Sequence, residues 1–227
     1  MSDIETLLRS NLEHSENFED CFDDLQDSQL PHSVTLCCSD SRVLQDHAWG
    51  NDQPGEIFTV SNIGNRTYQK TENGETPSGD VLYPVVHTDT DNIVVMGHTG
   101  CGAVTATYDS LTGSLEGEEP EGIEYCVGLL ESRLEEGVDE LPEGLERPEA
   151  INRLVEYNVD RQVEFLDESE EVPDDVNVYG VVYDFQDVYS GSRGEIHLIN
   201  VDGENKVEDL KDSYPEVQDR VERLWEY

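Results

Sequence analysis

The stretch N-I-V-V-M-G-H-T-G-C-G-A-V-T-A-T-Y, residues 92–108, changes from the pattern of a strand to that of a helix. Residues 92–98 have an unbroken apolar centre, which is typical of a strand that is covered on both faces of its sheet. Residues 103–108 follow after a short turn and are expected to begin a helix. A buried strand that leads directly into a helix is the repeating unit of α/β folds.

Four further runs have the composition of strands, and they alternate with helical patterns: residues 33–38, 56–62, 177–184 and 194–203. The last run alternates polar and apolar residues and follows a Gly-Ser-Arg-Gly turn, so it is predicted to be an antiparallel partner at the sheet edge. Helices are expected over residues 77–88, 148–166 and 204–225. The predicted fold class is α/β, with a central, mainly parallel β-sheet flanked by helices and an antiparallel edge strand.

Two proline positions carry local predictions. Thr76-Pro77 has the form of a helix N-cap followed by a proline in the first turn. Pro84 lies inside the same expected helix and should kink it. The 204–225 pattern is interrupted near Pro215.

The chain is expected to form a single domain over residues 1–227, because no linker interrupts it. Residues 1–25 are predicted to be an N-terminal helical arm, with apolar residues at helical spacing: Ile4, Leu7, Leu8 and Leu12. Residues 112–147 form an acidic variable segment that is rich in Gly, Glu and Pro, and its structure is left open.

The charge balance is strongly acidic. The sequence contains 53 acidic and 13 basic residues, for a formal net charge of −40 at pH 7. Repulsion at this density destabilises a compact state at low salt, and molar salt screens it by shortening the Debye length to roughly 3 Å. A halophilic protein is therefore expected, with an acidic tail or partner-binding patch as the alternative. The charge argues against nucleic acid and anionic membranes as partners.

The cysteines and the apolar runs indicate a cytoplasmic protein. Five cysteines form an odd set without the spacing of a disulfide framework, so reduced thiols are expected. No basic region followed by an apolar run marks a secretory signal near Met1. No apolar stretch approaches the roughly 18 residues that a membrane span needs. Cys21, Cys37 and Cys126 are interpreted as ordinary apolar side chains.

Three metal-binding side chains are placed at neighbouring strand ends. Cys38 ends the predicted strand 33–38, His98 ends the strand 92–98, and Cys101 begins the following helix. The carboxyl ends of parallel strands form the ligand crevice of an open sheet. Two thiolates and one imidazole suit zinc, and three protein ligands leave a fourth position open, as in catalytic zinc sites.

A charged pair follows the first cysteine. Asp40 and Arg42 are two residues apart and can reach the same crevice in a tight turn. A carboxylate held by a guanidinium stays ionised and oriented. It could accept a hydrogen bond beside the open metal position, or ligate the metal itself, or form a purely structural ion pair.

The paired motifs C-S-D-S-R (38–42) and G-H-T-G-C-G (97–102) resemble the β-class carbonic anhydrases. The resemblance covers residues 25–110 well and residues 150–203 loosely. It extends through S-N-I-G-N (61–65), V-L-Y-P-V-V (81–86) and V-Y-G-V-V-Y-D (178–184).

The resemblance implies a zinc lyase that reversibly hydrates carbon dioxide to bicarbonate and a proton by means of zinc-bound hydroxide. It implies one Zn²⁺ per chain on Cys38, His98 and Cys101, with Asp40 and Arg42 as the catalytic dyad. It also implies a homodimer or higher homo-oligomer, with an N-terminal helix that embraces a second subunit and active sites at the dimer interface.

The resemblance further assigns a substrate pocket, whose residues are Gln29, Phe58, Ile63, Tyr83 and Gly102. Two departures place the chain in the plant-like branch that bicarbonate does not inhibit. Ser61-Asn62 stands where the family has Arg-Asn, and Thr35 stands where the inhibited branch has tryptophan. An open zinc position near neutral pH is therefore expected. The alternatives are a carbonyl sulfide or carbon disulfide hydrolase on the same scaffold, and a non-catalytic zinc protein.

Overall fold

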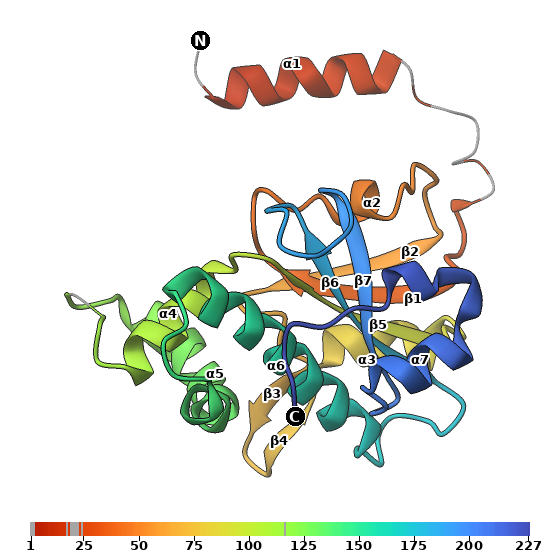
Figure 1. The fold of residues 1–227 in the computed structure, drawn as a ribbon. Coiled ribbons are helices and arrows are strands. Elements are labelled where there is room, and N and C mark those ends of the chain that lie inside the picture. The colour runs from red at the N-terminus through yellow and green to blue at the C-terminus, as the bar shows by residue number, and fades with distance from the viewer. Residues whose placement is uncertain (1–2, 17, 19–22, 24, 116) are drawn as a thin grey trace.

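The computed structural model describes residues 3–16, 18, 23, 25–115 and 117–227. Cys21 and part of the 1–25 arm lie outside these residues. The centre of the molecule is a five-stranded sheet in the order β2-β1-β5-β6-β7 (Figure 1). The strands are β1 (Ser33–Cys38), β2 (Ile57–Asn62), β5 (Asn92–His98), β6 (Asn177–Asp184) and β7 (Glu195–Val201). All pairs are parallel except β6 with β7, so the predicted fold class is confirmed.

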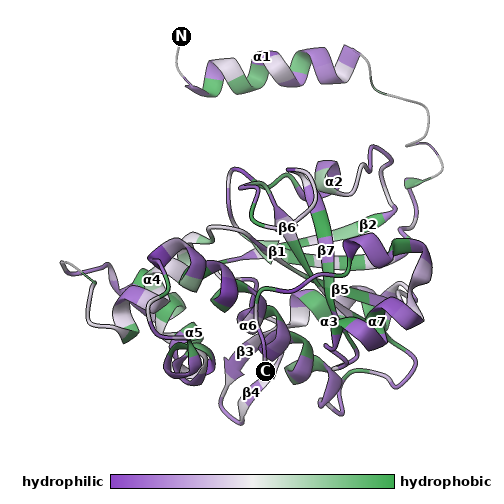
Figure 2. Ribbon diagram, in the orientation of Figure 1, coloured by the Kyte–Doolittle hydropathy of each residue, from purple (hydrophilic) through white to green (hydrophobic). Residues whose placement is uncertain are grey.

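The sheet separates two apolar clusters. Alternate residues of β1 point to opposite faces, so Leu36 and Cys38 join the larger cluster while Cys37 joins a smaller one with Met96. The larger cluster is covered by α6 (Arg147–Asp167), whose buried face includes Leu154 and Val159. Figure 2 shows hydrophobic residues in the strands of the sheet, whereas the helices alternate between hydrophobic and hydrophilic residues.

The acidic segment 112–147 contains a long helix, α5 (Glu121–Glu140). Its apolar residues Val127, Leu130 and Leu134 recur every three or four positions and are buried. This stripe packs against α4 (Gly102–Leu111) and α6. The helix thereby forms one wall beside the carboxyl end of β1.

The helix predicted to begin at Thr76-Pro77 begins later. Those two residues belong to β4 (Gly74–Pro77), which forms a hairpin with β3 (Tyr68–Thr71). The N-cap of α3 (Gly79–His87) is Ser78, whose hydroxyl accepts a hydrogen bond from the Asp80 backbone N–H at 3.3 Å. The N-cap prediction was wrong because the hairpin claims residues 74–77. The helix does run through Pro84.

The two ends of the chain differ in how they pack. Helix α1 (Asp3–Glu16) stands apart from the sheet in Figure 1, and none of its residues is buried. Near the other end, α7 (Val207–Ser213) and a 3₁₀ helix (Pro215–Arg220) replace the single helix expected over 204–225. The break falls at Pro215, as the sequence indicates. A short helix, α2 (Gln45–Ala48), follows β1.

Candidate metal centre

The three candidate metal ligands converge at one edge of the sheet. Cys38 is the last residue of β1, His98 is the last residue of β5, and Cys101 is the N-cap of α4. Because β1 and β5 are adjacent and parallel, their carboxyl ends lie side by side. The ligand atoms all lie within 4.8 Å of one another. All three residues are buried, at 6%, 0% and 1% exposure.

The histidine is oriented toward the thiols. His98 Nδ1 lies 3.0 Å from the Thr99 carbonyl oxygen, so we assign the ring proton to Nδ1. His98 Nε2 is buried and has no hydrogen-bond partner among the described residues. A buried nitrogen without a partner is destabilising unless something binds it. One imidazole lone pair and two thiols fit a zinc ion.

The two thiols interact with each other. The pKa of Cys38 is lowered to about 5, mainly by a hydrogen bond with the Cys101 thiol and also by His98 and the Gly64 N–H, against the opposing effect of burial. The Gly64 N–H donates to Cys38 Sγ at 3.3 Å. The hydrogen bond to Cys38, together with burial, raises the pKa of Cys101 well above its ordinary value. Cys38 is thus the thiol that ionises first.

The Asp40–Arg42 pair borders these ligands. Arg42 Nε donates to Asp40 Oδ1 at 2.9 Å, and Arg42 Nη2 donates to Asp40 Oδ2 at 2.6 Å. The Arg42 side chain is the main cause that lowers the pKa of Asp40 to about 2. Asp40 Oδ2 also lies 3.6 Å from His98 Nε2. A carboxylate that stays ionised therefore stands next to the candidate metal position.

A hollow of about 330 Å³ opens beside the ligands. Its lining includes Cys38 and Asp40, and the rest is largely apolar: Ile63, Gly102, Ala103, Ala106, Ile123, Cys126 and Val127 among others. Two of the predicted pocket residues, Ile63 and Gly102, line it. A small apolar molecule could approach the ligands from this side.

Three predicted pocket residues lie elsewhere in the same chain. Phe58 and Tyr83 pack together, with ring centroids 6.3 Å apart, and neither lines the hollow. Gln29 is exposed on the segment before β1. The roles of these residues remain predictions.

The three glycines of the motif at residues 97–102 occupy their positions for different structural reasons. A Cβ at Gly97 would lie 2.7 Å from a Val159 methyl group, so this glycine allows α6 to pack closely on β5. Gly100 has φ +61°, which favours glycine. Gly102 faces open space, consistent with its place at the hollow. At Gly97 the close approach is therefore between β5 and α6.

Sequence reasoning missed two groups of site residues. Ile123, Cys126 and Val127 come from α5, in the segment left without structure, although apolar spacing there was a usable signal. Asp184 and Phe185 contact the site from the carboxyl end of β6. That position was itself a signal, because strand carboxyl ends line the crevice.

Comparisons with known proteins agree with this arrangement. Residues 33–192 match the family model described as carbonic anhydrase, so the chain belongs to this family. The carbonic anhydrase of Helicobacter pylori strain J99 is 36% identical over 90 residues, which span 39% of this chain and 40% of that protein. The match thus spans about two fifths of that relative's length.

Solved β-carbonic anhydrases share the fold. The Coccomyxa enzyme in complex with acetazolamide superposes with a TM-score of 0.71 at 23% identity, covering 93% of this chain and 92% of that one. A tetrameric β-carbonic anhydrase of Sordaria macrospora gives a TM-score of 0.67 at 21% identity, covering 86% and 93%. The chain therefore has the fold of the β-carbonic anhydrases. None of the described helices has the length and apolarity needed to cross a membrane.

Proposed function

We propose that this chain catalyses the reversible hydration of carbon dioxide to bicarbonate and a proton, with one zinc ion on Cys38, His98 and Cys101. The observation that carries the proposal is the convergence of these three buried donors beside an ionised Asp40 and an apolar hollow. Family membership supports it.

Each part of the site has a chemical task. A zinc ion held by Cys38, His98 and Cys101 would supply a nucleophile, because zinc lowers the pKa of bound water to about 7. Asp40 is ionised at neutral pH and can only accept hydrogen bonds, so it orients an O–H donor toward the hollow. Ile63 and Val127 offer carbon dioxide an apolar surface. Arg42 keeps the carboxylate charged and fixed.

Replacing Asp40 by alanine is expected to lower kcat/KM for carbon dioxide by about 100-fold or more, because the orienting acceptor is lost. The measurement is stopped-flow hydration near pH 8 in molar salt, with zinc content determined on the same sample. Asp109→Ala is the matched control, because Asp109 on α4 makes a similar bidentate pair with Arg147, the first residue of α6. It should leave kcat/KM unchanged.

Two results would contradict the proposal. Wild-type turnover in Asp40→Ala would remove the dyad from the mechanism. A wild type that holds one zinc per chain but does not hydrate carbon dioxide would redirect the assay to carbonyl sulfide and carbon disulfide. Inactivity on all three substrates would leave a non-catalytic zinc protein.

We also place the chain in the plant-like branch that bicarbonate does not inhibit. Thr35 and Ser61 occupy the two diagnostic positions, and Gln45 joins them. The Thr35 hydroxyl donates to Gln45 Oε1 at 2.9 Å, and Gln45 Nε2 donates to Ser61 Oγ at 2.9 Å. This network is neutral, and Thr35 and Gln45 are buried in it while Ser61 is exposed. It supports the absence of an anion site, and with it an open zinc position near neutral pH.

A homodimer or higher homo-oligomer is part of the proposal. Ile4, Leu7, Leu8 and Leu12 on α1 are each more than half exposed, at 59%, 66%, 62% and 56%. A second copy would cover this apolar face. Tyr83, 50% exposed beside Phe58, lies on a surface that a second copy could also use. The tetrameric Sordaria enzymes make such assembly reasonable.

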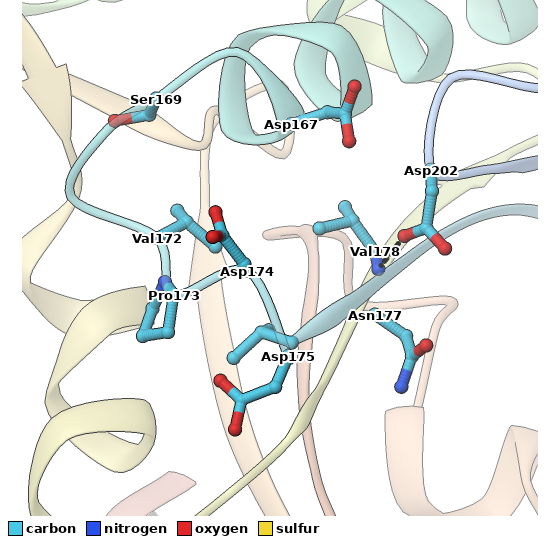
Figure 3. A pocket seen from close by; sticks show the side chains of 10 residues that line it. Asp167, Ser169, Val172, Pro173, Asp174, Asp175, Asn177, Val178 and Asp202 are labelled. Carbon is cyan, nitrogen blue, oxygen red and sulfur yellow. Dashed lines mark hydrogen bonds between the residues drawn. The ribbon is translucent and has the colours of Figure 1, made fainter.

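We place the protein in a reducing, salt-rich cytoplasm. Among the described cysteines, Cys37, Cys38, Cys101 and Cys126 form no disulfide. The acidic surface includes a hollow of about 340 Å³, whose lining residues include Asp167, Asp174, Asp175 and Asp202 (Figure 3). Cations at high concentration would screen these charges.

Asp167→Asn is expected to raise Tm by a few degrees at pH 7 in dilute buffer. Burial and the nearby charges of Asp202 and Glu168 raise the pKa of Asp167, so its ionised form is disfavoured in the folded protein. This destabilisation is absent below the unfolded-state pKa of about 3.9 and complete above the raised folded-state pKa. The gain should therefore disappear at acid pH and in molar salt.

Asp212→Asn, on the exposed side of α7, removes the same charge elsewhere and should give a smaller gain. Equal gains in dilute buffer would mean that only net charge matters. A wild type that stays folded and active without added salt would refute the halophilic interpretation.

A further inference from the structure

Phe185, the residue directly after β6, contacts both halves of the candidate metal centre. Its ring stacks on the His98 imidazole, with centroids 5.7 Å apart and planes inclined by 24°. The guanidinium carbon of Arg42 lies 4.8 Å from the centroid of the same ring. One side chain therefore touches a metal ligand and the arginine that holds Asp40.

Asp184 fixes the position of Phe185. Its carboxylate is buried and accepts a hydrogen bond from the Thr99 hydroxyl at 3.2 Å. It also accepts hydrogen bonds from three backbone N–H groups of the following loop, at 2.7–3.0 Å: those of Gln186, Val188 and Tyr189. The Phe185 N–H in turn donates to the Thr99 hydroxyl oxygen at 3.2 Å. Hydrogen bonds to Asp184 and to Thr99 thus fix the turn that carries the Phe185 ring.

Thr99 connects this turn to the metal ligand. The Thr99 carbonyl accepts the Nδ1 proton of His98, and the Thr99 N–H donates to the Tyr183 carbonyl at 3.1 Å. The partner of the distal nitrogen sets the direction in which a ligand histidine points its free nitrogen. The end of β6 therefore acts on the imidazole in two ways. Phe185 stacks on the face of the ring, and Tyr183 holds Thr99, whose carbonyl accepts the proton at the edge of the ring.

Arg42 needs such support more than His98 does. Its side chain is 49% exposed, and a solvent-exposed ion pair is weak and mobile. Besides Asp40, the guanidinium has two further contacts, the Phe185 ring and the Gly100 carbonyl at 3.1 Å. These contacts fix the guanidinium and, through it, the direction of the Asp40 carboxylate.

We infer that Phe185, held by Asp184, is a positioning residue that sets the orientation of His98 and of the Asp40–Arg42 pair together. The inference rests on the proposed function only for its effect on turnover. Its effect on metal binding is independent of any substrate.

The test compares Phe185→Leu with Phe185→Tyr and with Phe165→Leu. Leucine keeps apolar bulk but removes the ring, whereas tyrosine keeps the ring. Phe165 is a matched control, because its ring also lies near a guanidinium, that of Arg133 at 4.9 Å, and packs against Tyr68. The readouts are zinc affinity by chelator competition, the visible absorption spectrum of the cobalt(II)-loaded protein, and kcat and KM for carbon dioxide.

We expect Phe185→Leu to weaken zinc binding roughly 10-fold, to change the cobalt spectrum, and to lower kcat roughly 10-fold with KM little changed. Phe185→Tyr and Phe165→Leu should match the wild type in all readouts. Unchanged zinc affinity and an unchanged spectrum in Phe185→Leu would overturn the inference, as would equal losses in Phe165→Leu. If the wild type hydrates no carbon dioxide, the proposed function fails, while the affinity and the spectrum still decide the role of Phe185.

Discussion

Replacing Cys101 by alanine is expected to weaken zinc binding by well over 100-fold, because changes to partners of metal ligands alone already lower affinity by about 10- to 100-fold. Cys101 is one of only two thiols among the three converging donors, and its loss leaves a two-ligand site. Carbon dioxide hydration should fall to the background rate. The measurement is zinc per chain after dialysis against a weak chelator, followed by stopped-flow hydration.

Cys37→Ala is the matched control for this experiment. Cys37 is fully buried and adjacent to Cys38, but it points to the opposite face of the sheet, into the cluster with Val43 and Met96. Its replacement should lower stability by about 1 kcal/mol and leave zinc content at one per chain. A Cys101→Ala protein that still retains stoichiometric zinc would refute the proposed ligand set.

Replacing Arg223 by methionine is expected to reduce the free energy of unfolding by about 3–5 kcal/mol, because it leaves a buried carboxylate without its counter-charge. The side chains of Arg223 and Asp160 are 5% and 1% exposed. Arg223 Nη2 lies 2.5 Å from Asp160 Oδ2. Arg223 Nη1 also donates to the Ile199 carbonyl at 2.6 Å. The remaining donors to Asp160, Asn200 and Tyr227, do not neutralise it.

The measurement is urea unfolding at fixed molar salt, comparing midpoints at equal m-value. Arg220→Met is the control, because Arg220 lies on the same segment and pairs with Glu195 at 3.3 Å, with its side chain 39% exposed. The Arg220→Met variant should lose no more than about 1 kcal/mol in its free energy of unfolding. Similar losses in the free energy of unfolding for the two variants would show that the buried Arg223–Asp160 pair stabilises the fold no more than an exposed pair does.

The parts of the fold that could be predicted are those where a single segment determines its own structure. β1, β5 and β6 have the predicted bounds because each is a continuous apolar run that needs cover on both faces. The hairpin of β3 and β4 was missed because its strands are short and largely exposed, although Asn73-Gly74 is a turn signal. Helix α5 was missed because its many glutamates obscured a buried stripe.

The residues of the candidate site also differ in whether their own segment is enough to place them. Cys38, His98 and Cys101 could be predicted because strand ends and a short turn are enough to place them. The apolar spacing of α5 and the end of β6 were signals for Val127 and Phe185, but the sequence did not show which partners they contact, because that depends on how α5 and β6 pack around the site. The buried Arg223 likewise depends on where residues 221–227 cross α6, which no local pattern encodes.

The position of β5 between β1 and β6 has a consequence for the order of events in folding. Cys38 and His98 are 60 residues apart in the chain (98 − 38) and meet only when β5 pairs with β1. Such non-local parallel pairing forms slowly, after the loop-closure entropy has been overcome. The complete set of three donors therefore exists only once β1 and β5 have paired in the middle of the sheet.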